Sequence, residues 1–191
     1  MGHGFLRRPR ASIRKLLACQ RGYSVTELLT VMAILSFVLA GLSNLFVGAS
    51  KSELDMNKRF QAQQQALQGL EKIRRELHCA NSVSPASGTV QSITITLGSS
   101  CSTGTGTVTW CTIASGSTWQ LWRTPGSTCT ATGGVRWAEY LTAADAFTPT
   151  QPPSSLPYVH VYFPINVKGP SASTATYKVA DDIVLRNGAR S

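Results

Sequence analysis

Hydrophobic residues form one unbroken stretch near the start of the chain. It covers residues 28–47 and reads LLTVMAILSFVLAGLSNLFV, without a charged side chain. As an α-helix, a segment of this length would extend about 30 Å, which matches the hydrocarbon core of a bilayer. From Tyr23 to Ser50 the only charged side chain is Glu27. The pattern therefore predicts a membrane-spanning helix with a single carboxylate near its start.

The helical pattern continues past the apolar stretch. No proline occurs between Pro9 and Pro85, and hydrophobic residues recur at spacings of three, four and seven. We therefore expect one helix from about Ser24 to about Cys79, whose second half packs one face on a folded domain. The predicted contact stripe consists of Phe60, Leu67, Leu70, Ile73 and Leu77.

After Asn81 the periodicity changes from helical spacing to alternation, which is typical of β-strands. This part of the chain is also rich in Ser, Thr and Gly, which suit strands and turns better than helices. Residues 107–113 and 118–123 flank a turn at 114–117, and we expect them to form a hairpin.

Two further strands are expected nearer the C-terminus. Residues 158–167 alternate cleanly, with Pro164 inside the run, which favours an edge strand because proline cannot donate a ladder hydrogen bond. Residues 177–186 are the last strand candidate. We expect residues 135–147 to form a short helix and the proline-rich residues 148–157 to form a loop. Together these elements predict an α+β fold, with a long N-terminal helix packed on an antiparallel sheet.

The positive charge of the chain is concentrated at its start. Of the net charge of +9, the first 22 residues contribute +6, with six basic and no acidic side chains. A basic segment before an apolar helix favours a cytoplasmic N-terminus and an extracytoplasmic C-terminal domain. The remaining residues carry only +3, so we do not expect nucleic acid to be a partner.

Five cysteines occur, one of them, Cys19, in the basic segment. The other four lie beyond the apolar stretch, where an exported domain would form two disulfides with three possible pairings. We favour Cys101–Cys129 with Cys79–Cys111, because a strand meander brings the loops that hold Cys101 and Cys129 to the same end of the sheet. Free thiols are the alternative. A zinc site is disfavoured because no CxxC spacing occurs.

The segment QRGYSVTELLTVMAILSFVLAGL resembles the N-terminal motif of type IV prepilins and pseudopilins. In those families a basic leader ends in Gly, a hydrophobic or aromatic residue follows, and Glu stands fifth after the cleavage point. Gly22, Tyr23 and Glu27 occupy these positions here. The match covers about 30 residues and combines the spacing of Gly and Glu with the basic leader and the apolar stretch.

The resemblance implies a role for each of these residues. A prepilin peptidase would cut after Gly22, and the new amino group of Tyr23 would be methylated. Glu27 would pair with the Tyr23 ammonium of a neighbouring subunit during assembly. The implied partners are the peptidase, other pilin or pseudopilin subunits, an assembly platform protein and the membrane.

This organisation divides the chain into four segments. Residues 1–22 would be the cleaved cytoplasmic leader, and 23–50 the membrane or filament-core half of the helix. Residues 51–80 would be its amphipathic half, and 81–191 an extracytoplasmic β-rich domain. The strings WQLWRT and DDIVLRN also look like parts of minor pilins and J-type pseudopilins, which favours a minor subunit.

Two other interpretations of the apolar stretch remain open. A plain signal anchor would make the chain a single-pass, membrane-anchored extracytoplasmic binding protein that does not polymerise. A cleaved secretory signal would release the domain at Ser50, after the small residues Gly48 and Ala49, but the apolar run is longer than usual for such a signal.

No enzymatic motif occurs. The sequence lacks GxSxG, HExxH, a Walker loop and a GxGxxG strand–helix junction, and its three histidines are far apart. Asp181 and Asp182 would point to opposite faces of a strand, which disfavours a shared acid–base or metal role. We therefore expect a structural, non-enzymatic subunit without a cofactor or metal, serving a pilus, a secretion pseudopilus or a DNA-uptake filament.

Overall fold

The computed structural model describes residues 22–99, 101–170 and 176–187. The chain divides into two compact units, one ending at Lys51 and the other comprising residues 52–191. Of the predicted leader, residues 1–22, only Gly22 is described, and residues 1–21 lie outside the described residues.

One long helix, α2, covers Val25–Cys79 and contributes to both units. Its bounds confirm the predicted helix to within one residue at its start. Uninterrupted helix is expected here because no proline occurs and glycine is infrequent. The helix ends where the alternating pattern begins, and Ala80 already belongs to a strand.

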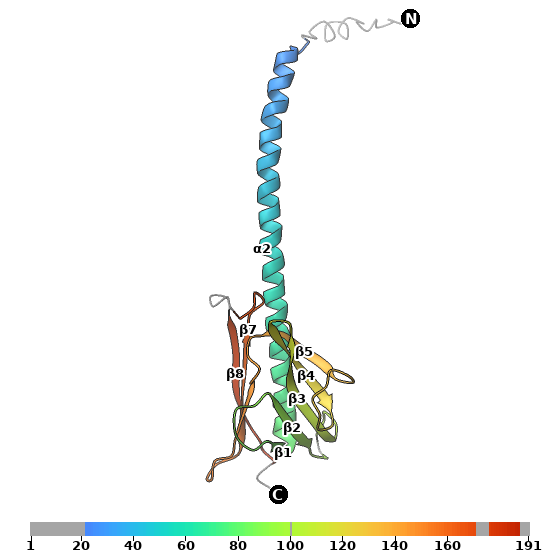
Figure 1. Cartoon of the computed structure of the whole chain (residues 1–191), viewed down its shortest axis with the longest axis vertical. Coiled ribbons are helices and arrows are strands. Elements are labelled where there is room, and N and C mark those ends of the chain that lie inside the picture. Colours follow the sequence, from blue (N-terminus) through green and yellow to red (C-terminus); the bar gives the residue numbers. More distant parts are fainter. Residues whose placement is uncertain (1–21, 100, 171–175, 188–191) are drawn as a thin grey trace, which may run out of the picture. The chain divides into compact units, whose positions relative to one another are not determined.

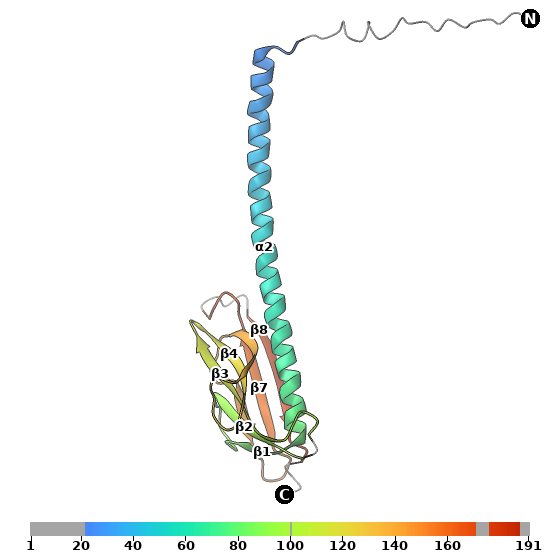
Figure 2. The same cartoon turned by 90° about the vertical axis from the view of Figure 1, so that its right-hand side faces the viewer.

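The described part of the second unit contains eight strands in one antiparallel sheet. Their order is β1-β2-β3-β4-β5-β7-β6, and β8 pairs with the other edge of β7. The sheet curls around the second half of α2, so that β7 and β8 lie on one side of the helix and β3, β4 and β5 on the other (Figures 1 and 2). The strands are β1 Ala80–Ser84, β2 Ser92–Leu97, β3 Gly106–Ser115, β4 Thr118–Pro125, β5 Val135–Leu141, β6 Phe147–Thr150, β7 Tyr158–Ile165 and β8 Tyr177–Val184.

The fold class is the predicted one, a long helix packed on an antiparallel sheet. The hairpin of β3 and β4 is confirmed, with Ser115 paired to Thr118 at its turn. The predicted helix over 135–147 is wrong, because these residues form β5 and the start of β6.

The error at β5 has an identifiable cause. Its fully buried residues, Ala138 and Leu141, are three positions apart, which is helical spacing. A strand can bury both because its register against β4 shifts between Trp119 and Leu121. Tyr140, with a φ of 62°, adopts a left-handed conformation there, as expected for an irregular strand.

The assignment of 158–167 to an edge strand is also wrong. β7 pairs with β6 on one edge and with β8 on the other. β6 pairs with β7 only as far as Val161. Pro164 is tolerated because it lies beyond this pairing and its nitrogen points to the same edge of β7 as β6. There its carbonyl accepts a hydrogen bond from the backbone N–H of Thr142, so the missing N–H leaves no ladder partner unpaired.

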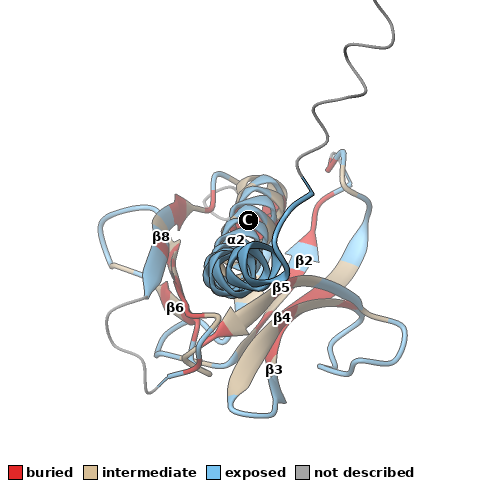
Figure 3. Cartoon of the chain, turned by 90° about the horizontal axis from the view of Figure 1, so that it is seen from above, coloured by how far each residue is buried: buried red, intermediate tan, exposed pale blue. Residues whose placement is uncertain are grey.

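The core lies between one face of α2 and the concave face of the sheet (Figure 3). Leu70, Ile73 and Leu77 of the predicted stripe are buried, but Phe60 and Leu67 are 61% and 41% exposed. In this part of the helix, small residues rather than Phe60 and Leu67 face the sheet, because the curled sheet contacts the helix closely. The rest of the buried face consists of Ala62, Ala66, Gly69 and Glu76.

Candidate functional site

The predicted cleavage and assembly residues lie together at the start of α2. Gly22 and Tyr23 precede the helix, and both are exposed. The first helical hydrogen bond runs from the N–H of Leu28 to the carbonyl of Ser24. Glu27 lies in the first turn, where the positive end of the helix dipole favours a carboxylate. Backbone on both sides of the Gly22–Tyr23 bond is therefore accessible, with a carboxylate about one turn away.

The first part of α2 presents hydrophobic side chains in every direction. The large apolar side chains from Tyr23 to Val47 are between 49% and 81% exposed. This helix is long and apolar enough to cross a membrane, with a mean hydropathy of 2.1 in its most apolar window. Surface of this kind is stable only against lipid or against other apolar helices.

The few polar groups in this stretch mostly satisfy themselves. The hydroxyls of Thr30, Ser36 and Ser43 each donate to a backbone carbonyl three or four residues earlier, at 2.8–2.9 Å. Such bonds allow hydroxyls to enter a hydrocarbon environment. Glu27 has no comparable partner among the described residues, so its carboxylate is the one charged group of the apolar helix available to another molecule.

The four cysteines of the second unit form two disulfides, but not in the preferred pairing. The bonds are Cys79–Cys101 and Cys111–Cys129, with Cα–Cα distances of 5.4 and 6.0 Å. Two disulfides fit an extracytoplasmic domain, since such bonds persist in oxidising compartments.

The faces of the sheet explain why the preferred pairing is wrong. Trp110 points towards α2, where its indole contacts Glu76, so its neighbour Cys111 points to the opposite face. Cys79 ends the helix on the inner side, where its carbonyl accepts a hydrogen bond from Gly98 in the loop that leads to Cys101.

The loop between β4 and β5 covers the outer face instead. Thr109, on the same face as Cys111, donates to the carbonyl of Gly126, and Thr124 donates to that of Thr128. These contacts place Cys129 over Cys111. Cys101 follows β2 and Cys129 follows β4, and these two strands end at the same end of the sheet, as predicted. The two cysteines nevertheless lie on opposite faces of the sheet.

A buried carboxylate that the sequence interpretation missed joins α2 to the sheet. Glu76 is fully buried, and its two oxygens accept hydrogen bonds from Trp110 Nε1 at 2.7 Å and Arg123 Nε at 2.8 Å. Lys72 Nζ lies 3.5 Å from the same carboxylate, one helical turn earlier. The i,i+4 spacing of Lys72 and Glu76 was visible in the sequence, but the contacts with β3 and β4 were not.

The adjacent carboxylates of β8 point to opposite faces, as predicted. Asp181 accepts two hydrogen bonds from Arg74 of α2, and Asp182 lies 2.6 Å from His160 of β7. The hydrogen bond to Asp181 raises the pKa of the Arg74 guanidinium above its ordinary value. No group of three His, Cys, Asp or Glu side chains in the described part of the chain could hold a metal ion.

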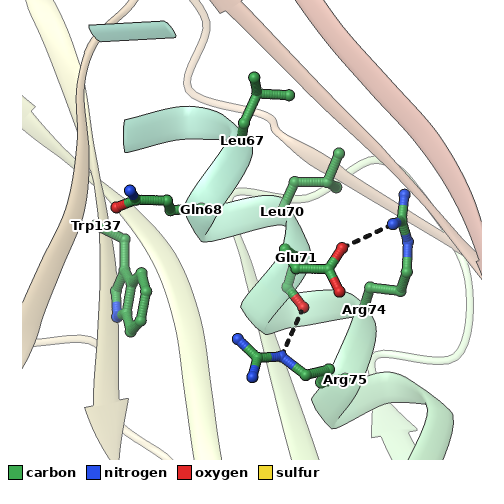
Figure 4. Close-up of a pocket in the computed structure, with 7 residues that line it drawn as sticks. All are labelled: Leu67, Gln68, Leu70, Glu71, Arg74, Arg75 and Trp137. Atoms are coloured by element: carbon green, nitrogen blue, oxygen red, sulfur yellow. Dashed lines mark hydrogen bonds and ion pairs between the residues drawn. The ribbon is translucent and has the colours of Figure 1, made fainter. Parts of the chain in front are cut away.

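A groove of about 560 Å³ opens beside the exposed face of α2, with Trp137 of β5 as one wall (Figure 4). A smaller groove, lined also by Val135 and Arg136 of β5, shares Gln68 and Trp137 with it. The indole of Trp137 packs on Trp110 with ring centroids 5.7 Å apart, which holds this wall in place. The larger groove is lined by Leu67, Gln68, Leu70, Glu71, Arg74, Arg75 and Trp137.

No family model, curated protein or solved structure matches this chain. Its function therefore has to be argued from the start of α2, the disulfide-linked sheet and the surface around the helix.

Proposed function

We propose that this chain is a structural subunit of a type IV pilus-like filament, a minor pilin or pseudopilin processed after Gly22. The observation that carries the proposal is the start of α2. A single carboxylate, Glu27, lies one turn after an accessible Gly22–Tyr23 bond, on a helix that is otherwise apolar and exposed.

Filament assembly would account for features that a plain anchor does not need. One apolar helix is sufficient to hold a domain on a membrane, and a charged residue in it costs free energy, about 2.5–3.5 kcal/mol near the bilayer centre and less towards the interface. A carboxylate retained in such a helix is expected to have a partner. An ammonium created by cleavage at Tyr23 of a neighbouring subunit would supply one.

The second unit is compatible with an exported, non-enzymatic role. Two disulfides link strands and loops that begin at the end of the helix, and the charged clusters around Glu76 and Asp181 are engaged in packing α2 on the sheet. These contacts would keep the domain fixed to the helix that enters the filament.

The mature N-terminus tests the proposal. Intact mass and N-terminal sequencing of protein from cells with an active prepilin peptidase should show methylated Tyr23 as the first residue. A chain that retains Met1 would instead support a membrane-anchored binding protein, and one that begins at Ser50 would support secretion.

A matched pair of glycine variants tests the cleavage site. Gly22→Leu should leave the precursor uncut and still bound to the membrane, because the apolar helix is unchanged. Gly48→Leu, a similar change where a Cβ would meet open space, should be processed normally. Normal-length mature protein from Gly22→Leu would contradict the assigned site.

A further inference from the structure

The sheet has an open edge at β5. β5 pairs with β4 from Val135 to Leu141, with one register shift at Trp137 and another between Ala138 and Leu141, but it pairs with β7 only at Leu141, which faces Ile165. Beyond that contact the chain turns away, and Asn166 donates its backbone N–H to the carbonyl of Tyr140. From Val135 to Glu139, no strand of the described residues pairs with this edge of β5.

The groove beside α2 lies along this edge. The curled sheet covers α2 from β8 on one side and from β5 on the other, and leaves one strip of the helix uncovered (Figure 3). Gln68, Glu71 and Arg75 are exposed on that strip, and Leu67 is 41% exposed. A strand added to β5 would therefore lie over the helix strip and continue the curl of the sheet.

The charges along the groove favour an acidic occupant. Arg75 hydrogen-bonds only the backbone carbonyl of Glu71 on its own helix and has no carboxylate partner among the described residues. Glu71 binds Arg74, which it shares with Asp181, and Glu139 binds Arg136, so no acidic side chain of the groove contacts Arg75. The groove thus offers a guanidinium without a carboxylate partner, beside a strand edge that no described strand pairs from Val135 to Glu139.

We propose that the β5 edge binds an extended acidic segment of a partner protein by strand addition. Backbone hydrogen bonds to β5 would supply most of the affinity, and Arg75 would select a carboxylate on the face that meets the helix. Trp137 and Leu67 lie on the same helix-facing side and would contact the methylene groups of those acidic side chains. This binding uses the second unit alone and is independent of filament assembly.

The test uses the full chain in detergent micelles and a fluorescein-labelled, N-acetylated peptide of alternating valine and glutamate. Fluorescence anisotropy should show saturable binding, and the corresponding peptide of valine and lysine should bind at least about fivefold more weakly. If the glutamate peptide does not bind even when the protein is titrated to about millimolar concentration, the proposal is overturned.

N-methylation of the peptide separates strand addition from adsorption to the groove. In an extended peptide the valine N–H groups point to one edge and the glutamate N–H groups to the other. Methylation of one set should weaken binding at least about tenfold, and methylation of the other set should leave it unchanged. Equal effects of the two methylations, or no effect of either, would refute strand addition.

Variants of the protein test the predicted side-chain contact. Arg75→Ala should weaken binding of the glutamate peptide by about threefold to fivefold, and Arg75→Glu should reverse the preference towards the lysine peptide. Arg186→Ala removes another exposed arginine outside the groove and should bind as the wild type does. An unchanged preference in Arg75→Glu would exclude Arg75 as the selecting residue and overturn the proposal.

Discussion

The indole nitrogen of Trp110 in β3 donates a 2.7 Å hydrogen bond to Oε2 of Glu76 in α2, and both side chains are fully buried. Because Arg123 binds the other carboxylate oxygen, Glu76 fixes the position of the helix against two strands. A buried carboxylate is costly to dehydrate, and only such directional contacts offset the cost. The cluster therefore specifies which face of α2 meets the sheet and the position of the helix along its own axis.

Substitution at this contact should lower stability without altering the membrane helix. Trp110→Phe leaves Oε2 of Glu76 buried without its donor, which should cost about 1–3 kcal/mol of unfolding free energy. Glu76→Gln should cost a similar amount, because Arg123 and Lys72 lose their counter-charge. Chemical denaturation of both variants and of the double variant measures the coupling.

If the two residues interact as described, the double variant will lose clearly less than the sum of the single losses. Trp122→Phe is a suitable control. Trp122 is only partly buried, and its indole donates to Gln120 on its own strand rather than to the helix. Fully additive losses for Trp110 and Glu76 would contradict the contact.

The two disulfides should stabilise the second unit independently. They close loops with sequence separations of 22 and 18, for which chain-entropy arguments give about 3 kcal/mol each. Cys79→Ser with Cys101→Ser should free the end of α2 from the β2–β3 loop. Cys111→Ser with Cys129→Ser should free only the β4–β5 loop.

Non-reducing peptide mapping checks the pairing directly, and proteolysis of the two double variants checks its consequences. The second variant should become sensitive within residues 126–134 while the rest of the sheet stays protected. Recovery of a peptide that joins Cys79 to Cys111 would contradict the pairing described here.

Gly69 should tolerate no large side chain. A Cβ at this position would lie 3.0 Å from Leu121 Cδ2 and 3.5 Å from Trp137 Cβ, so the helix and sheet are in near contact there. Gly69→Leu should destabilise the second unit by about 1–3 kcal/mol through overpacking. Gln64→Leu, at an exposed position of the same helix, is the matched control and should change the thermal midpoint little.

The sequence allowed α2 and the β3–β4 hairpin to be predicted because each keeps one periodicity along its length. β5 was missed because a register shift and the left-handed Tyr140 place its buried residues three apart. An irregular strand of this kind has the pattern of a helix until its neighbour is known.

The interior contacts were less accessible to sequence reasoning than the elements. An acidic residue one turn after a lysine usually indicates an exposed helix face, and nothing local shows that Glu76 is buried beneath Trp110 and Arg123. For the cysteines, strand order placed the loops at one end of the sheet, but the pairing depends on which face each loop covers. The motif at Gly22, Tyr23 and Glu27 is local, and its assignment stays a prediction from the sequence that the fold does not test.

Replacement of Glu27 should separate processing from assembly. Glu27→Val leaves Gly22 and Tyr23 unchanged, so the variant should still be cut, and removal of the charge should make membrane insertion easier. What is lost is the proposed partner of the Tyr23 ammonium of a neighbouring subunit. Screening is weak within lipid or a filament core, so that ammonium would be left unpaired at high cost. Mature protein should therefore accumulate in the membrane while its incorporation into filaments falls at least about tenfold.

Fractionation into membrane and sheared-filament pools, followed by blotting, measures this separation. Glu27→Asp should restore assembly only in part, because its carboxylate is one methylene shorter. Thr30→Val, which removes a hydroxyl bonded to the carbonyl of Glu27 within the helix, is the control for a polar-to-apolar change in the same turn and should assemble normally. Equal filament incorporation of Glu27→Val and wild type would exclude the pairing as the basis of assembly, even if cleavage after Gly22 were confirmed. Cleavage depends on the Gly22–Tyr23 bond before the helix, whereas the proposed pairing depends on the carboxylate in the first helical turn.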